Sequence, residues 1–117
     1  ELRRAAVELA TPAACQFTAL LLARADYEPT VAELRRRLLD RNVMALGLAA
    51  ARAFARGEIT AEPDPHELYA RLVGPVLMRV AVERRPATDE FVDQIIDDAM
   101  LRLLPATARP ARRLRAT

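Results

Sequence analysis

The sequence predicts an all-α fold. It is expected to be an antiparallel helical bundle domain whose last two helices form a four-helix-bundle dimer interface with a second copy. Apolar residues recur at helical spacing, helix-start signals precede the periodic segments, and no period-2 alternation bounded by glycine marks a strand. The chain has 117 residues, of which 52% are hydrophobic, enough for one domain with its own core. We expect this domain to cover residues 1–104 and the basic segment 105–117 to be disordered.

The first clear helix is predicted over residues 12–25. Thr11 supplies an N-cap, and Pro12 is preorganised for the first helical position. Because apolar residues occupy nearly its whole circumference, we expect this helix to run through the middle of the domain. Residues 1–10 have the pattern of the end of a connecting helix.

A long helix is predicted next, from a capping box formed by Thr30 and Glu33 to Arg56. Gly57 follows as its stop signal. Its first half is amphipathic, whereas its second half is apolar or small nearly all round. We therefore expect this helix to run from the surface into the interior.

Two further helices follow, joined by a short turn. Asp64 and Pro65 start the first, and Thr88 caps the second, over residues 89–104. Gly74-Pro75 interrupts the first of them, and a proline inside a helix costs about 3 kcal/mol. We expect the interruption to be tolerated because a bend and a small residue are needed where two helices cross closely.

These last two helices have more apolar surface than one chain needs. In the final helix the apolar arc spans about 180°, whereas a helix that covers only its own core needs roughly 100°. We expect a second copy of the chain to cover the excess, which predicts a homodimer. The alternative is that the earlier helices cover both faces within one chain. The expected dimer-interface residues are Ala70, Val73, Gly74, Leu77, Ala81, Val92, Ile96, Ala99 and Leu103.

Composition narrows the setting. Cys15 is the single cysteine, so no internal disulfide can form and a reducing, cytoplasmic compartment is expected. No apolar stretch approaches the roughly 18 residues of a membrane span, so we expect no membrane partner. The 18 basic residues are all arginines, interleaved with 16 acids to a net charge of +2, which does not by itself indicate nucleic-acid binding.

No motif for catalysis, cofactor binding or metal binding is present. His66-Glu67 begins like a metalloprotease motif, but position 70 is alanine, so the second ligand is missing. There is neither a glycine-rich phosphate loop nor a Gly-x-Ser-x-Gly elbow. We expect no enzyme, no cofactor and no metal.

A small-molecule site needs apolar walls with a few polar groups aimed inward. In the buried helices, Gln16 and Asn42 are the polar candidates. Ordinary core packing is the alternative for all of these residues, and the Tyr69 hydroxyl could lie at the dimer seam instead. The candidate ligand-binding residues are Gln16, Phe17, Leu20, Asn42, Met44, Leu48, Tyr69 and Met78.

Several segments, taken in order, resemble the C-terminal regulatory domain of the tetracycline-repressor (TetR) family of bacterial transcription regulators. They are "ARGEI" at 55–59, Asp64-Pro65 with Leu68, "LVGPVLMRV" at 72–80 and "PATDEFVDQIIDDAMLRLL" at 86–104. The resemblance is carried by their order and spacing. It covers residues 30–104 by motif and residues 1–29 by helical pattern alone.

The resemblance implies an all-helical domain, a homodimer built on the final two helices, and a pocket for a small apolar or amphipathic effector. It also implies that operator DNA is bound only through an N-terminal helix-turn-helix. We find no such motif upstream of residue 30, so this chain alone should not bind operator DNA specifically. The alternative is a helical protein–protein interaction and dimerisation module that encloses no ligand.

Overall fold

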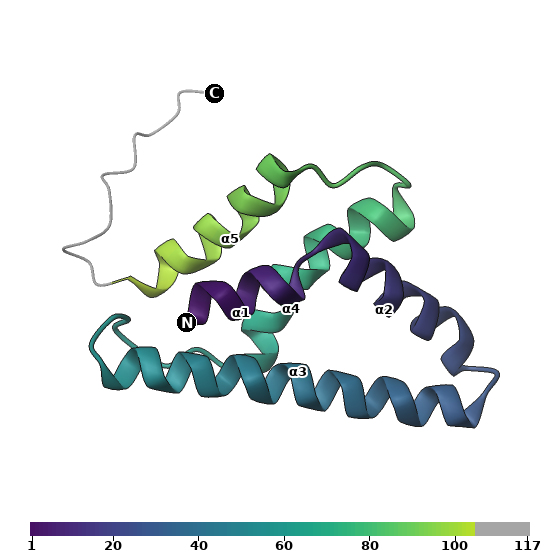
Figure 1. Ribbon diagram of the computed structural model, residues 1–117, viewed down its shortest axis with the longest axis horizontal. Helices are drawn as coiled ribbons and strands as arrows, with labels where there is room; N and C mark the ends of the chain where they lie inside the picture. The colour runs from purple at the N-terminus through teal and green to yellow at the C-terminus, as the bar shows by residue number, and fades with distance from the viewer. Residues whose placement is uncertain (105–117) are drawn as a thin grey trace.

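The computed structural model describes residues 1–104, which form helices and connecting turns with no strand among them (Figure 1). The all-α prediction is confirmed, whereas the segment 105–117 lies outside the described residues. The elements are α1 (Leu2–Leu9), α2 (Pro12–Ala25), α3 (Pro29–Ala55), α4 (Pro65–Leu77), a short π-helix η1 (Met78–Val82) and α5 (Asp89–Leu103).

Helices α1 and α4 hold the arrangement together, because each packs against the four other α-helices. The long α3 runs along one edge of the molecule, and α1 lies between α3 and α5 (Figure 1). The expectation that α2 runs through the middle is wrong. Only one face of α2 is buried, and three of its large apolar side chains, Phe17, Leu20 and Leu22, are exposed.

Side-chain caps start the helices where the sequence predicts them. The Thr11 hydroxyl accepts a hydrogen bond from the Ala14 N–H (3.2 Å), and the Thr88 hydroxyl accepts one from the Phe91 N–H (3.2 Å). The Asp64 carboxylate accepts hydrogen bonds from the first N–H groups of α4 at 2.8 and 3.3 Å. These caps satisfy backbone donors that have no partner within the helix.

The start of α3 differs from the prediction. The helix begins at Pro29, with Glu28 as a residue that provides no side-chain cap, so the expected capping box is absent. Proline suits the first helical position because its fixed φ is already helical and its missing N–H would have no partner there. The Glu33 carboxylate instead binds Arg36 and Arg37 on the helix surface.

The end of α3 agrees with the prediction. Gly57 has a φ of 75°, a left-handed conformation that favours glycine. The Gly57 N–H donates to the Phe54 carbonyl (3.0 Å), and the Glu58 N–H donates to the Ala53 carbonyl (2.9 Å). This pair of bonds is the Schellman arrangement that stops a helix.

The expected helix around Gly74-Pro75 is divided into two elements. Pro75 has no N–H to donate to the preceding turn, and α4 passes into the π-helix η1 shortly after it. The wider turn is closed by the Glu83 N–H, which donates to the Met78 carbonyl (2.9 Å). Arg84 then takes a left-handed conformation (φ 55°), which turns the chain towards α5.

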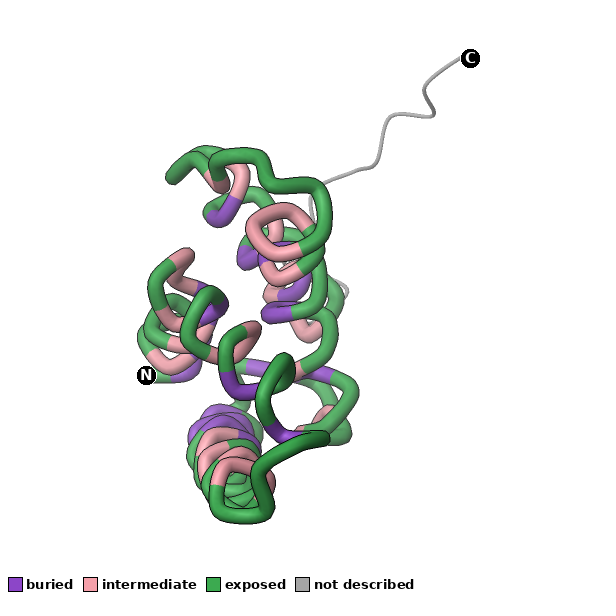
Figure 2. The backbone as a smooth tube through the Cα atoms, turned by 90° about the vertical axis from the view of Figure 1, so that its right-hand side faces the viewer, coloured by how far each residue is buried: buried purple, intermediate pink, exposed green. Residues whose placement is uncertain are grey.

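The core lies where α1, α4, α5 and the second half of α3 meet. Its largest fully buried side chains include Leu46, Leu72, Val76 and Ile96. The buried stretches of these helices face one another in the interior (Figure 2). Every buried residue of α3 lies at or after Val43, as expected for a helix that runs from the surface towards the interior. Only one face of this second half is buried, however, because Met44, Leu48 and Phe54 are exposed.

Candidate functional site

An apolar cavity of about 270 Å³ opens between α2, α3 and α4. This volume is close to the lower end of the range for small-molecule sites. The wall is almost entirely apolar, and the cavity is half open to solvent. We call it the α2–α3–α4 cavity; it is lined by Thr18, Leu21, Leu22, Arg35, Leu38, Leu39, Tyr69, Ala70, Val73, Gly74 and Leu77.

Helical spacing brings these side chains to one place. Residues three and four apart lie on the same face of a helix, and each of the three helices contributes such a set. On α4 the cavity side carries the small residues Ala70 and Gly74. A Cβ atom built at Gly74 would meet no atom within 4 Å. The absence of large side chains at these two positions therefore leaves room in the cavity.

Few polar groups reach this wall. The Thr18 hydroxyl donates to the Ala14 carbonyl of its own helix (3.0 Å), so towards a ligand its oxygen can only accept. Tyr69 and Arg35 are both half-buried. Among residues 1–104 neither the Tyr69 hydroxyl nor the Arg35 guanidinium has a hydrogen-bond or ion-pair partner.

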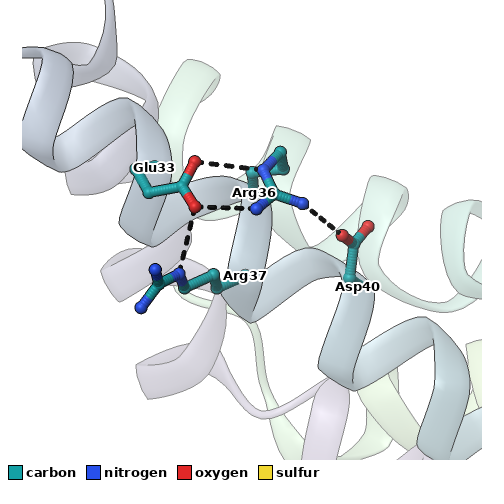
Figure 3. Close-up of polar contacts among 4 residues, drawn as sticks. All are labelled: Glu33, Arg36, Arg37 and Asp40. Atoms are coloured by element: carbon teal, nitrogen blue, oxygen red, sulfur yellow. Dashed lines mark hydrogen bonds and ion pairs between the residues drawn. The ribbon is translucent and has the colours of Figure 1, made fainter.

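The two arginines that follow Arg35 are both paired with carboxylates, as Figure 3 shows. Arg36 binds Glu33 at 2.7 Å and Asp40 at 3.1 Å, and Arg37 binds Glu33 at 3.0 Å. Hydrogen bonds from Arg36 and then Arg37 lower the pKa of Glu33 to about 2. Glu33 and Asp40, the carboxylates close to Arg35 along α3, are therefore already bound by other arginines.

The structure separates the ligand-binding residues expected from the sequence. Tyr69 lines the α2–α3–α4 cavity, whereas Gln16 lines an open depression beside Arg84 and Arg85. Asn42 is half-buried one turn after Leu38. The remaining candidates are exposed and do not line the cavity, so nothing unites them at this site; they are Phe17, Leu20, Met44, Leu48 and Met78.

The expected dimer-interface residues also differ in how far they are buried. Val73, Val92, Ile96 and Ala99 are buried in the core of the chain itself, so within this chain they are not on an open surface. Ala70 and Gly74 are exposed, and Leu77, Ala81 and Leu103 are half-buried. The members of this set that lie on the wall of the α2–α3–α4 cavity are Ala70, Val73, Gly74 and Leu77.

Helix α1 covers part of α5. It packs against α5 and buries Leu2, Ala6 and the following Ala10 in the core. The Arg3 guanidinium binds the Asp97 carboxylate at 2.7 Å across the two helices. The sequence pattern of residues 1–10 indicates only a connecting helix, so it does not show that this segment covers part of the apolar surface of α5.

Sequence reasoning missed most of the cavity wall, including Thr18, Leu22 and Arg35. A signal was available in α3, where Arg35 shares a helical face with Leu38 and Leu39. An arginine on a face of leucines differs from the arginines that follow it, which lie on the charged side. The sequence pattern of α3 alone does not indicate which of its faces another helix covers.

Other chemistry-bearing groups lie away from the cavity. Burial raises the pKa of the Cys15 thiol to about 11, which keeps it protonated and unreactive at neutral pH. Within residues 1–104 no cluster of His, Cys, Asp and Glu is arranged to hold a metal ion. In the same range no single helix is both long and apolar enough to cross a bilayer; α1 and α2 reach that length only as a pair bent by 54°.

Comparison with known proteins identifies the family. The chain matches the family model of the tetracycline-repressor-like C-terminal domain over residues 1–99. The match therefore includes residues 1–29, for which the resemblance rested on helical pattern alone. The comparisons with curated proteins and with solved structures find no match. With most of its length matched and an all-α fold of the expected kind, the chain belongs to the tetracycline-repressor-like C-terminal domain family, the regulatory domains of TetR-type transcription regulators.

Proposed function

We propose that this domain binds a small apolar or amphipathic effector in the α2–α3–α4 cavity. The observation that carries the proposal is the apolar wall itself, which three helices build around a volume of about 270 Å³. Burial of an apolar molecule there is favourable by roughly 25 cal/mol for each Å² of apolar surface removed from water. The few polar groups at the wall would fix its orientation.

The position of α4 suggests how an occupant could act elsewhere. Ala70 and Gly74 lie on the cavity wall, whereas Leu72 and Val76 of the same helix lie in the core with α1 and α5. A ligand that favours one position of α4 would therefore bias the packing of α1. We propose that this domain belongs to a longer regulator in which a helix-turn-helix that binds operator DNA precedes α1, so that α1 would connect the two.

The effector proposal can be tested with N-phenyl-1-naphthylamine, a neutral dye that fluoresces in apolar sites. Ala70→Leu places a large side chain in the cavity, and we expect it to weaken dye binding at least about tenfold. Ala45→Leu is the matched control, because Ala45 is exposed on α3 and does not line the cavity.

Circular dichroism establishes that both variants are folded before titration. Dye binding that is equally strong in Ala70→Leu and the original chain would overturn the cavity assignment. The alternative function, a dimerisation module without a ligand, has support in the exposed apolar side chains of α3, such as Met44 (72% exposed) and Leu48 (51%). Failure of the original chain to bind the dye would favour that alternative.

We further propose a homodimer through the outward face of α4, η1 and α5. Pro75, Met78 and Val82 follow one another at helical spacing and are exposed, with Met78 at 51% and Val82 at 67%. Between α4 and α5 a shallow groove contains Pro75, Arg71 and Asp98. A face with an apolar stripe and both signs of charge can pair with its own copy about a two-fold axis.

Sedimentation velocity tests this dimer. The original chain should sediment with twice the 13.0 kDa mass of one copy. Pro75→Arg adds a cation beside Arg71 at the proposed two-fold interface, and we expect it to weaken association at least about tenfold. Pro29→Arg is the matched control, since Pro29 is exposed at the start of α3. A dimer that persists unchanged in Pro75→Arg would exclude this face.

A further inference from the structure

We infer that the occupant of the α2–α3–α4 cavity is an anionic amphiphile, with an apolar body inside the cavity and one acid group bound by Arg35 at its mouth. This inference rests on the proposed effector function and gives the effector a chemical class. It is carried by the contrast between Arg35 and the two arginines that follow it.

The first argument is charge. Arg36 and Arg37 are exposed, and both bind the Glu33 carboxylate (Figure 3). Arg35 is half-buried and has no ion pair within residues 1–104. A cation that borders an apolar wall and has no ion-pair partner can gain a charge-assisted hydrogen bond from an anionic ligand. A ligand that brings its own acid group would supply this partner.

The second argument is the position of Arg35 on the wall. It precedes Leu38 and Leu39 on the face of α3 that lines the cavity. Arginine can lay its methylene groups along an apolar surface while its charged end stays near water. The cavity is half open and its wall is almost entirely apolar, so this arrangement would place the cation at the mouth and leave the interior for hydrocarbon.

The third argument concerns the remaining polar groups. The Thr18 hydroxyl donates its proton to the Ala14 carbonyl, so it offers a ligand an acceptor only. The Tyr69 hydroxyl can donate one hydrogen bond to a neutral or charged ligand. Only Arg35 distinguishes an acid from an alcohol of equal length, because the guanidinium can form two parallel hydrogen bonds with a carboxylate.

Competition titrations test the inference with octanoate and 1-octanol, which share a chain length and differ in charge. Each is titrated at pH 7 against the bound naphthylamine dye. Arg35→Gln should weaken octanoate binding about tenfold and leave 1-octanol binding within a factor of two. Arg41→Gln is the matched control, because Arg41 is exposed on the same helix and does not line the cavity.

The outcomes separate the two proposals. If Arg35→Gln leaves octanoate binding unchanged, or weakens both probes equally, the assignment of Arg35 as an acid-binding residue is overturned. In that case dye binding that is still blocked by Ala70→Leu leaves the effector proposal standing. If the dye does not bind the original chain, the proposed function itself fails.

Discussion

The two halves of α3 lie in different surroundings. The second half is packed into the core with α1, α4 and α5, and Leu46 is fully buried there. The first half borders the α2–α3–α4 cavity, and none of its residues before Val43 is buried. One helix therefore lies in two environments, because its second half is packed into the core while its first half, the cavity half, borders a half-open cavity.

Side chains of the same kind show the difference. Leu72 of the core is fully buried, whereas Leu39 and Leu22 on the cavity wall are 38% and 43% exposed. Helix α4 combines both environments, with Leu72 towards the core and Gly74 towards the cavity. Substitutions a few residues apart on this helix should therefore have opposite consequences for stability.

The largest expected effect is the loss of a core side chain. Leu72→Ala should lower the free energy of unfolding by about 2–5 kcal/mol, since it removes buried apolar surface and leaves a cavity behind. The matched substitution Leu39→Ala, on the cavity wall, should cost less than about 1.5 kcal/mol because Leu39 already contacts solvent. Urea denaturation followed by circular dichroism gives both values. Equal losses would mean that the cavity half is packed as tightly as the core.

Alanine substitutions at two glycines should change the free energy of unfolding by less, with an increase at one position and a decrease at the other. Gly74 lies inside α4, and an added Cβ would meet no atom within 4 Å, so Gly74→Ala should stabilise the helix by about 0.5–1 kcal/mol. Gly57→Ala should destabilise the protein by roughly 1–2 kcal/mol, because φ at Gly57 is 75° and alanine is strained there. Thermal unfolding compares the two variants. A loss of stability in Gly74→Ala would show that another backbone approaches this position in solution, as a tight helix crossing requires.

The helix starts could be predicted from the sequence because capping is local. The Thr11, Asp64 and Thr88 side chains each bond to backbone N–H groups within three residues. Such contacts depend little on the rest of the fold. The start of α3 was mispredicted for an equally local reason, since Pro29 occupies the first helical position ahead of Thr30.

The partners of apolar faces could not be predicted in the same way. In α5 the wide apolar arc is covered in part by α1, a short segment whose own pattern gave no indication of where it packs. In α2 and the second half of α3, apolar residues surround the helix, so periodicity did not say which side would face the interior. The exposure of Phe17 and Met44 could not be predicted for this reason. The pattern of α3 likewise did not show the position of Arg35 on the cavity wall.

The smallest expected effect is at the exposed ion pairs of the cavity half. Hydrogen bonds from Arg36 and then Arg37 hold the pKa of Glu33 at about 2, below its ordinary value of 4.5. A lowered folded-state pKa contributes stability that is present above pH 4.5 and is lost as the pH falls towards 2. Because all these groups are exposed, water and salt screen the interaction, and Glu33→Gln should change stability at pH 7 far less than Leu72→Ala does. Carboxyl NMR titration should give a low pKa for Glu33 that rises towards its ordinary value in 1 M NaCl. An ordinary pKa at low salt would show that these arginines are free in solution, and it would remove the contrast between them and Arg35.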